Sequence, residues 1–137
     1  MIDQLIKADA AARTLGIELV HAGDGEAELT MPAPLSLDDL DANAFFLADT
    51  AFAYACASAG FIAVTHQMHV EFIGDAPPKS TPLRALARLH HSVHRTVYVN
   101  VDVLADQHTV AEFRATGARI RRNPSRTEDG RRTAAMP

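Results

Sequence analysis

The sequence predicts an α+β fold in which a curved antiparallel sheet wraps around one long central helix. Residues 42–59 are rich in alanine, contain no valine or isoleucine, and are apolar nearly all round, which is typical of a buried helix ended by Gly60. Most of the chain on either side of this segment alternates apolar and polar residues, the pattern of strands with one buried face. A helix that is apolar all round needs cover on several sides, and we expect the strands to provide it.

A helix and a β-hairpin are predicted before the central helix. Apolar residues at helical spacing predict an amphipathic helix over about residues 2–14, ended by Gly16. Residues 17–21 and 26–31 then flank the turn sequence Ala-Gly-Asp-Gly, so they are predicted to pair as antiparallel strands. In the second of these strands alanine, leucine and methionine should face inward, because they alternate with glutamates and a threonine.

Three or four further strands are predicted after the central helix. Each segment alternates apolar and polar residues, so one of its faces should be buried and the other should be exposed to water. The residues expected to face the core are Met68, Val70 and Phe72; Leu83, Ala85, Ala87 and Leu89; Val97, Val99, Val101 and Val103; and Ala111, Phe113 and Ala115.

Length and composition predict one globular domain. A chain of 137 residues is long enough to bury one core, and 47% hydrophobic with 22% charged residues is the balance of a globular protein. We expect a domain over residues 1–121 and a basic, disordered tail over residues 122–137. The N-terminus lacks the uninterrupted apolar run of a signal peptide, and no apolar run reaches the length of a membrane span. A cytoplasmic protein without membrane contact is therefore expected.

The charge pattern and the single cysteine exclude several functions. The net charge of −4 combines −8 over residues 1–118 with +4 over residues 119–137. Nucleic-acid binding is not expected, because the body is acidic and no aromatic or glycine-rich motif accompanies the arginines. The basic tail is interpreted as solvated, with contact to an anionic ligand's phosphates as the alternative. Cys56 has no partner for an intrachain disulfide, and within an apolar stretch it is more typical of core packing than of a nucleophile.

Asp49 is the candidate catalytic residue. It lies in the middle of the apolar helix, where a carboxylate removed from water is costly and where aspartate is a poor helix former. One interpretation is that Asp49 faces solvent or is satisfied by a neighbouring group. The other is that it is a general base or nucleophile able to activate water against an acyl carbon.

The residues around Asp49 resemble a known family. Residues 47–60, Leu-Ala-Asp-Thr-Ala-Phe-Ala-Tyr-Ala-Cys-Ala-Ser-Ala-Gly, resemble the central-helix signature of the hotdog-fold thioesterases of phenylacetic acid degradation, the PaaI-like family. The similarity extends over about residues 10–121. Three further segments carry the similarity. The chain from residues 15–19 to residues 29–32 is similar to the family's first hairpin, residues 70–72 to the strand after the helix, and residues 112–114 to the last strand.

The resemblance implies a hotdog fold and hydrolysis of acyl-CoA thioesters. It also implies a homodimer, or a tetramer made of two dimers, in which the sheets of paired subunits are continuous. No metal or other cofactor is expected beyond the CoA of the substrate. In such enzymes the acid that matches Asp49 activates water or attacks the thioester. A backbone N–H at the start of the same helix in the partner subunit then holds the developing oxyanion.

The loop before the helix departs from the family pattern. The family carries an asparagine and then His-Gly-Gly at this point, whereas here the loop is shorter, the asparagine has no counterpart, and Leu40-Asp41-Ala42 occupy the His-Gly-Gly positions. The oxyanion donors are therefore expected to be the backbone N–H groups of Asp41 and Ala42. An aspartate at a helix start tends to cap the free N–H groups with its own carboxylate, and it would also bring a negative charge to the site.

Further site residues are expected from the same resemblance. Thr65 is the nearest match to a hydroxyl that positions water, and Phe46 and Thr50, which flank Asp49 on the helix, are expected to contact the substrate. The segment 92–96 is placed near the CoA phosphates, where His94 and Arg95 supply positive charge, although a solvated turn is the alternative.

A metal site is not expected from the histidines or from the acidic residues before the helix. His66 and His69 fall on opposite faces of a strand. The histidines at 90, 91 and 94 are predicted to lie in a hairpin turn, with no cysteine or acid at ligand spacing. The acidic segment 38–41 is more typical of a helix cap than of a metal cluster.

Two functional classes remain open from the sequence. The first is a thioesterase that hydrolyses a small or aromatic acyl-CoA to the free acid and CoA. Its activity is expected to be weak, because the loop before the central helix departs from the family pattern. The second is a hotdog protein that binds acyl-CoA or a partner without turnover, and a hydratase on the same scaffold is a more distant third. The missing His-Gly-Gly loop is the sequence feature that separates the first two classes.

Overall fold

The computed structural model describes residues 10–34, 40–74 and 81–120. Two helices and six strands lie in these segments. The elements are α2 (Ala10–Thr14), β1 (Glu18–Gly23), β2 (Glu26–Met31), α3 (Leu40–Ser58), β3 (Ile62–Phe72), β4 (Leu83–Val93), β5 (Thr96–Ala105) and β6 (His108–Ile120).

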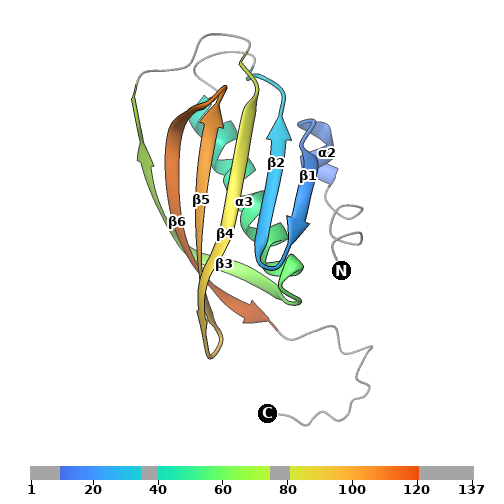
Figure 1. Ribbon diagram of the computed structural model, residues 1–137, viewed down its shortest axis with the longest axis vertical. Helices are drawn as coiled ribbons and strands as arrows, with labels where there is room; N and C mark the ends of the chain where they lie inside the picture. Colours follow the sequence, from blue (N-terminus) through green and yellow to red (C-terminus); the bar gives the residue numbers. More distant parts are fainter. Residues whose placement is uncertain (1–9, 35–39, 75–80, 121–137) are drawn as a thin grey trace.

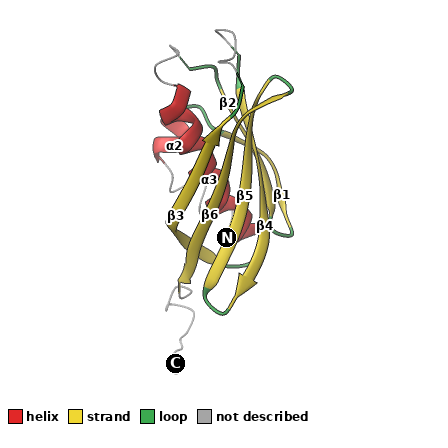
Figure 2. Ribbon diagram, turned by 90° about the vertical axis from the view of Figure 1, so that its left-hand side faces the viewer, coloured by secondary structure: helices red, strands yellow, loops and turns green. Residues whose placement is uncertain are grey.

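The six strands form one antiparallel sheet in the order β1-β2-β4-β5-β6-β3. The sheet is strongly twisted, and α3 lies along one side of it (Figure 1 and Figure 2). Strand β3 follows α3 in the chain but lies at the far edge, beside β6. The result is a sheet curved around one long helix, as the sequence predicted. None of the described helices is long and apolar enough to cross a membrane.

The core lies between α3 and the inner face of the sheet. Alternate residues of the central strands are fully buried, as in β5, where the exposed fractions of Val97, Val99, Val101 and Val103 are all 0%. The matching residues of β2, β4 and β6 are buried too, and they are Ala27, Leu29 and Met31; Leu83, Ala85 and Ala87; and Ala111, Phe113 and Ala115. The predicted alternation of these strands is therefore confirmed.

The β1–β2 hairpin holds the C-terminal end of α3. Its two turn residues, Asp24 and Gly25, have φ angles of 54° and 86°, which is the left-handed conformation that a two-residue hairpin turn requires and that an Asp-Gly pair adopts readily. The Gly25 N–H donates a hydrogen bond of 2.8 Å to Ser58 Oγ, which in turn donates to the carbonyl of Ala55. The Leu89 N–H donates to the Gly25 carbonyl at 2.7 Å, so the turn also contacts β4.

Some predicted boundaries differ from those observed. The central helix spans Leu40–Ser58 rather than residues 42–59. Of the predicted N-terminal helix, Ala10–Thr14 is observed, whereas residues 2–9 and the tail at 122–137 lie outside the described residues. The prediction that three histidines share a hairpin turn is wrong for His90 and His91, which lie within β4. That strand runs on to Val93, because β4 and β5 extend together beyond the core, and only His94 lies in the turn.

Strand β3 is less buried than its sequence pattern predicts. Met68 and Val70 are half-buried against the core, whereas Phe72, which pairs with the buried Ala111 and so shares the inner face, is 48% exposed. The predicted face is right for Phe72, but the predicted burial is not. Among the described strands β3 pairs with β6 alone, and its pairing register shifts between Thr65 and Gln67, as in a β-bulge. An edge strand lacks a neighbour on one side, which explains why both of its faces stay partly exposed.

Candidate functional site

Asp49 and Thr65 are brought together by the fold. The Thr65 hydroxyl of β3 donates a hydrogen bond of 2.9 Å to Asp49 Oδ1 of α3. These residues are 16 positions apart in the chain, and they meet because β3 returns alongside α3 after the turn at Gly60. The two side chains that the sequence singled out for base and water-positioning roles are therefore direct neighbours.

Asp49 is exposed in the single chain and accepts a hydrogen bond from a neighbouring side chain, which is the arrangement that the first interpretation of this residue describes. Asp41, Phe45 and Asp49 follow one another at four-residue spacing and form an exposed stripe on the first half of α3, where the helix adjoins β3 and β6. Apart from its bond to Thr65, the carboxylate can accept hydrogen bonds from water. This arrangement suits a group that must bind and orient a water molecule.

Phe45 is the apolar neighbour of Asp49 on the exposed stripe. Its ring is 48% exposed and packs edge-on against Phe113 of the core, with 6.3 Å between ring centroids and 66° between planes. Phe46, which the sequence placed in substrate contact, is only half-buried, whereas Thr50 is buried and its hydroxyl donates to the Phe46 carbonyl at 2.9 Å. Sequence reasoning missed Phe45, although its position one turn before Asp49 is the signal that identifies it.

Asp41 and Ala42 are exposed in the first turn of α3, where backbone N–H groups lack intrahelical partners. The described part of α3 begins at Leu40, directly after residues that the structure does not describe, so the capping role of Asp41 stays a prediction. Within residues 40–74 no hydrogen bond to the Asp41 carboxylate is found. Both residues are exposed, and the carboxylate of Asp41 brings a negative charge to this end of the helix.

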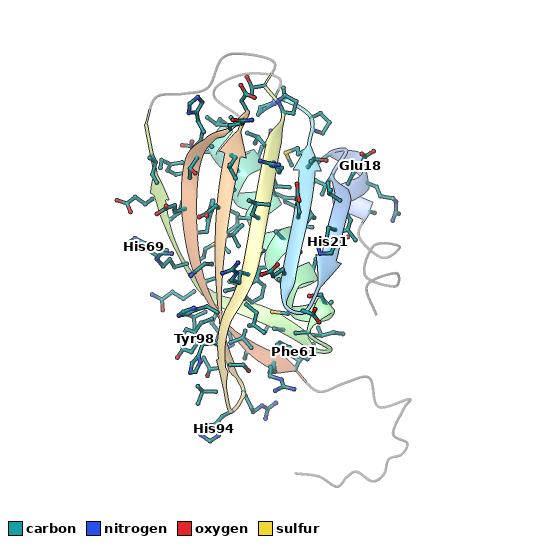
Figure 3. All side chains as sticks on the ribbon, viewed as in Figure 1. Glu18, His21, Phe61, His69, His94 and Tyr98 are labelled. Carbon is teal, nitrogen blue, oxygen red and sulfur yellow. The ribbon has the colours of Figure 1, made fainter. Side chains whose placement is uncertain are left out.

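His94 and Arg95 form the tip of the β4–β5 hairpin, at the end of the molecule where α3 ends (Figure 3). His94 adopts a φ of 55° in the turn. Arg95 lies opposite Arg119 of β6, whose N–H donates to the Arg95 carbonyl at 2.7 Å. No ion pair is found for Arg95 or Arg119 with any of the described acids, so the pair carries unneutralised positive charge.

Arg119 is a site candidate that sequence reasoning missed. Its guanidinium carbon lies 4.4 Å from the centroid of the Phe61 ring, which is a cation–π contact. This contact holds the side chain in place while its N–H groups remain available to an anion. No sequence pattern singles out Arg119, because only the antiparallel register of β5 and β6 places it beside Arg95.

Cys56 is buried in the core, and burial raises the pKa of its thiol from 9.0 to about 12. A thiol with such a pKa remains protonated at neutral pH and is a poor nucleophile. Within the described segments no three histidine, cysteine or acidic side chains are grouped so that they could hold a metal ion.

A groove of about 440 Å³ lies on the outer face of the sheet, away from α3. Charged side chains of β2 and β4 line it, and two of them, Arg88 and Glu26, pair with each other at 3.1 Å. This groove shares no residue with the Asp49–Thr65 site.

An antiparallel sheet curved around one long helix, with a carboxylate midway along that helix beside the edge strand, defines a hotdog-fold domain with an acidic site. The chain is 34% identical over 118 residues to the acyl-coenzyme A thioesterase PaaI of Escherichia coli strain K12, covering 82% of this chain and 84% of that protein. The chain therefore belongs to the PaaI acyl-CoA thioesterase family. No protein-family model matches the sequence.

Solved structures agree with this assignment. The E. coli PaaI structure superposes with a TM-score of 0.75 at 31% identity, covering 87% of this chain and 90% of that one. A mutant of the phenylacetic acid degradation protein PaaI from Thermus thermophilus gives 0.70 at 26% identity, covering 82% and 100%. A hypothetical thioesterase from Streptococcus pneumoniae, solved with coenzyme A, gives 0.75 at 19% identity, covering 88% and 97%, and supports the fold alone.

Proposed function

We propose that this protein hydrolyses the thioester of a small or aromatic acyl-CoA, releasing the free acid and CoA. The observation that carries the proposal is the 2.9 Å hydrogen bond between Thr65 and Asp49 on the exposed stripe of α3. A base must be within hydrogen-bond reach of the proton that it accepts, and the exposed carboxylate meets that requirement for a bound water molecule. Membership of the PaaI family supports the choice of substrate.

In the proposed mechanism Asp49 is the general base. Thr65 holds Oδ1, which orients the carboxylate and leaves Oδ2 to accept a proton from water. The water oxygen bonds to the thioester carbonyl carbon as its proton passes to Asp49. The carbon–sulfur bond then breaks, and the CoA sulfur leaves with the electron pair and takes up a proton. Direct attack by the carboxylate, followed by hydrolysis of the resulting anhydride, is the alternative route for the same residue. Neither route requires a metal or another cofactor.

The carbonyl oxygen needs donors as negative charge develops on it. We assign this role to the backbone N–H groups of Asp41 and Ala42 in a second subunit, because the first turn of a helix offers free N–H groups and a positive dipole end. The apolar face of Phe45, with Phe46 beside it, supports the acyl group. Thr50 contributes through the helix, since its hydroxyl is bonded to the Phe46 carbonyl.

The site requires at least a homodimer, and strand β3 supplies a surface for it. In the described part of the chain β3 pairs with β6 alone and leaves its other edge unpaired, and its residues Ile62 and Val64 are 41% and 46% exposed. Unpaired edges and exposed apolar side chains are the features that pair two sheets into one. We expect light scattering to report a dimer, or a tetramer of two dimers, at micromolar concentration. A stable monomer would contradict the shared site.

The CoA phosphates are assigned to the basic end of the molecule. His94 and Arg95 supply positive charge there, and the opposed Arg119 adds a third group. We place the protein in the cytoplasm, where CoA thioesters are substrates, and we expect no nucleic-acid or membrane partner.

The decisive experiment is a thiol-release assay with acyl-CoA substrates of different length and with aryl-CoA. Release of CoA by the wild-type protein that is lost in Asp49→Asn supports hydrolysis at this site. Tight binding of a non-hydrolysable acyl-CoA analogue without any thiol release would favour the second candidate, a non-catalytic acyl-CoA-binding protein. The observation that favours that candidate is the negative charge of Asp41 beside the oxyanion donors.

A further inference from the structure

Gly117 occupies a crowded point where β6 crosses beneath α3. It is buried and pairs with Thr65 of β3 on one side and Val97 of β5 on the other. A Cβ atom built on Gly117 would lie 2.4 Å from the Val64 carbonyl oxygen and 2.7 Å from Cζ of Phe52. Both distances are shorter than real Cβ contacts. The φ of Gly117 is not in the left-handed region, so it is space and not backbone conformation that demands a glycine here.

The two atoms that a Cβ would displace belong to the immediate neighbours of the proposed site. Phe52 is fully buried and stands three residues after Asp49, on an adjoining face of α3. Val64 is the residue before Thr65 in β3. Contact of the Phe52 ring with the bare backbone of Gly117 therefore sets how closely α3 approaches the sheet. Contact with the Val64 carbonyl sets how closely β3 lies against β6.

The register shift of β3 begins at the same place. Thr65 pairs with Gly117, and the shift follows between Thr65 and Gln67. A bulge bends its strand and re-aims the neighbouring side chain, and here that side chain is the hydroxyl that reaches Asp49. We propose that Gly117 is a positioning residue whose missing side chain sets the 2.9 Å contact between Asp49 and Thr65. The proposal rests on the hydrolytic function assigned above and adds a residue that touches neither water nor substrate.

Gly117→Ala is the direct test. The added methyl group must displace the Phe52 ring or the Val64 backbone, so the Asp49–Thr65 contact lengthens. Misplacement of a catalytic group by about 1 Å costs about 100-fold in rate, so we expect kcat to fall by about 10- to 100-fold with KM nearly unchanged. Adding Phe52→Leu removes the ring atom nearest the new methyl group. The double variant should recover part of the lost kcat, and it also serves if Gly117→Ala alone does not fold.

Two controls separate positioning from a general loss of stability. Val103→Ala creates a cavity in β5 at a distance from the proposed site. Val103 pairs with Ala111 of β6, and Ala111 is six residues from Gly117, which is about 20 Å along the strand. Val103→Ala should lower Tm without changing kcat. Thr65→Val removes the hydroxyl, so it should lower kcat, and adding Gly117→Ala to it should lower kcat little further, because both act on one contact. Independent, multiplicative losses in that pair would overturn the proposal.

A crystal structure of the Gly117→Ala variant gives a readout that does not depend on activity. A longer Asp49 Oδ1–Thr65 Oγ1 distance is the expected result, and an unchanged distance would also overturn the proposal. If the wild-type protein releases no thiol from any acyl-CoA, the proposed function fails, whereas the distance still decides what Gly117 does. If the wild type is active and Gly117→Ala keeps the wild-type kcat, only the role of Gly117 fails.

Discussion

The two faces of helix α3 differ in almost every respect although they belong to one element. The face toward the sheet buries Ala44, Leu47 and Ala51 completely. The exposed stripe consists of Asp41, Phe45 and Asp49. The first face holds the helix on the sheet, whereas the second presents a carboxylate, an aromatic ring and first-turn N–H groups to a ligand. Stability and chemistry are thus assigned to different sides of the same 19 residues, so substitutions should affect them separately.

The largest contrast should appear in the reactivity of Cys56. Since burial raises the pKa of this thiol from 9.0 to about 12, the thiolate fraction near neutral pH should be about 1,000-fold lower in the folded protein than in the unfolded chain. Alkylation by iodoacetamide, followed by mass spectrometry with and without guanidinium chloride, measures this ratio. Equal rates in both conditions would show that the Cys56 thiol is accessible to solvent in the folded protein.

The same thiol adds a pH dependence to folding. A pKa that is raised in the folded state means that the folded protein holds this proton more tightly. The contribution is therefore fully present below pH 9.0 and is lost as the pH rises toward about 12. In Cys56→Ala, the alkaline decline of Tm should be smaller than in the wild-type protein.

Asp49→Asn should give the next largest effect, and it should be confined to turnover. Loss of a general base or nucleophile should lower kcat by about 100-fold or more. Because the carboxylate is exposed and, among the described residues, is bonded through Thr65 alone, Tm should change little. Steady-state thiol release and thermal unfolding on one preparation measure both quantities, and unchanged turnover would remove Asp49 from the mechanism.

Leu47→Ala and Phe45→Ala form a matched pair across the two faces. Leu47 is 0% exposed, so its truncation leaves a cavity and should lower the free energy of unfolding by about 2 kcal/mol or more. Phe45 is 48% exposed and should cost less than half as much, whereas KM for aryl-CoA should rise. Urea unfolding and initial rates give the two comparisons. A reversal of the order would mean that assembly buries the stripe.

Asp41→Gly should give the smallest effect and the only gain. Removing a negative charge beside the oxyanion donors at a helix start should raise kcat/KM by about two- to fivefold, which corresponds to less than about 1 kcal/mol. The wild-type protein should accordingly be slow, with kcat/KM for aryl-CoA below about 10⁴ M⁻¹s⁻¹. A wild-type value at or above that figure, or a variant that loses stability without any gain in rate, would make Asp41 merely structural.

The sequence predicted the fold well because most strands alternate strictly. In β5 every second residue is a buried valine, so period and burial agree. In β3 the bulge after Thr65 breaks the alternation and the edge position exposes Phe72, and neither feature follows from local pattern. The family signature and the mid-helix position singled out Asp49, and Thr65 was found by resemblance.

What the sequence did not predict depends on contacts between distant segments. The central helix is apolar nearly all round, so its sequence does not say which side the sheet covers, and the exposure of Asp49 and Phe45 could not be read from it. Arg119 and Gly117 acquire their neighbours only through the register of β6 with β5 and β3. Pairing between strands is decided by the whole sheet and not by any one segment.

The hairpin turn at Gly25 gives the protein an internal reporter of local opening. The Gly25 amide proton is bonded to Ser58 at the end of α3, and the Leu89 amide proton is bonded to the Gly25 carbonyl. The Gly25 amide proton becomes exchangeable when the end of the helix separates from the sheet, whereas the Leu89 amide proton stays protected as long as the turn remains paired with β4. Hydrogen–deuterium exchange at Gly25, with Leu89 as the internal reference, therefore measures the free energy of docking the helix end, separately from that of unfolding the whole domain.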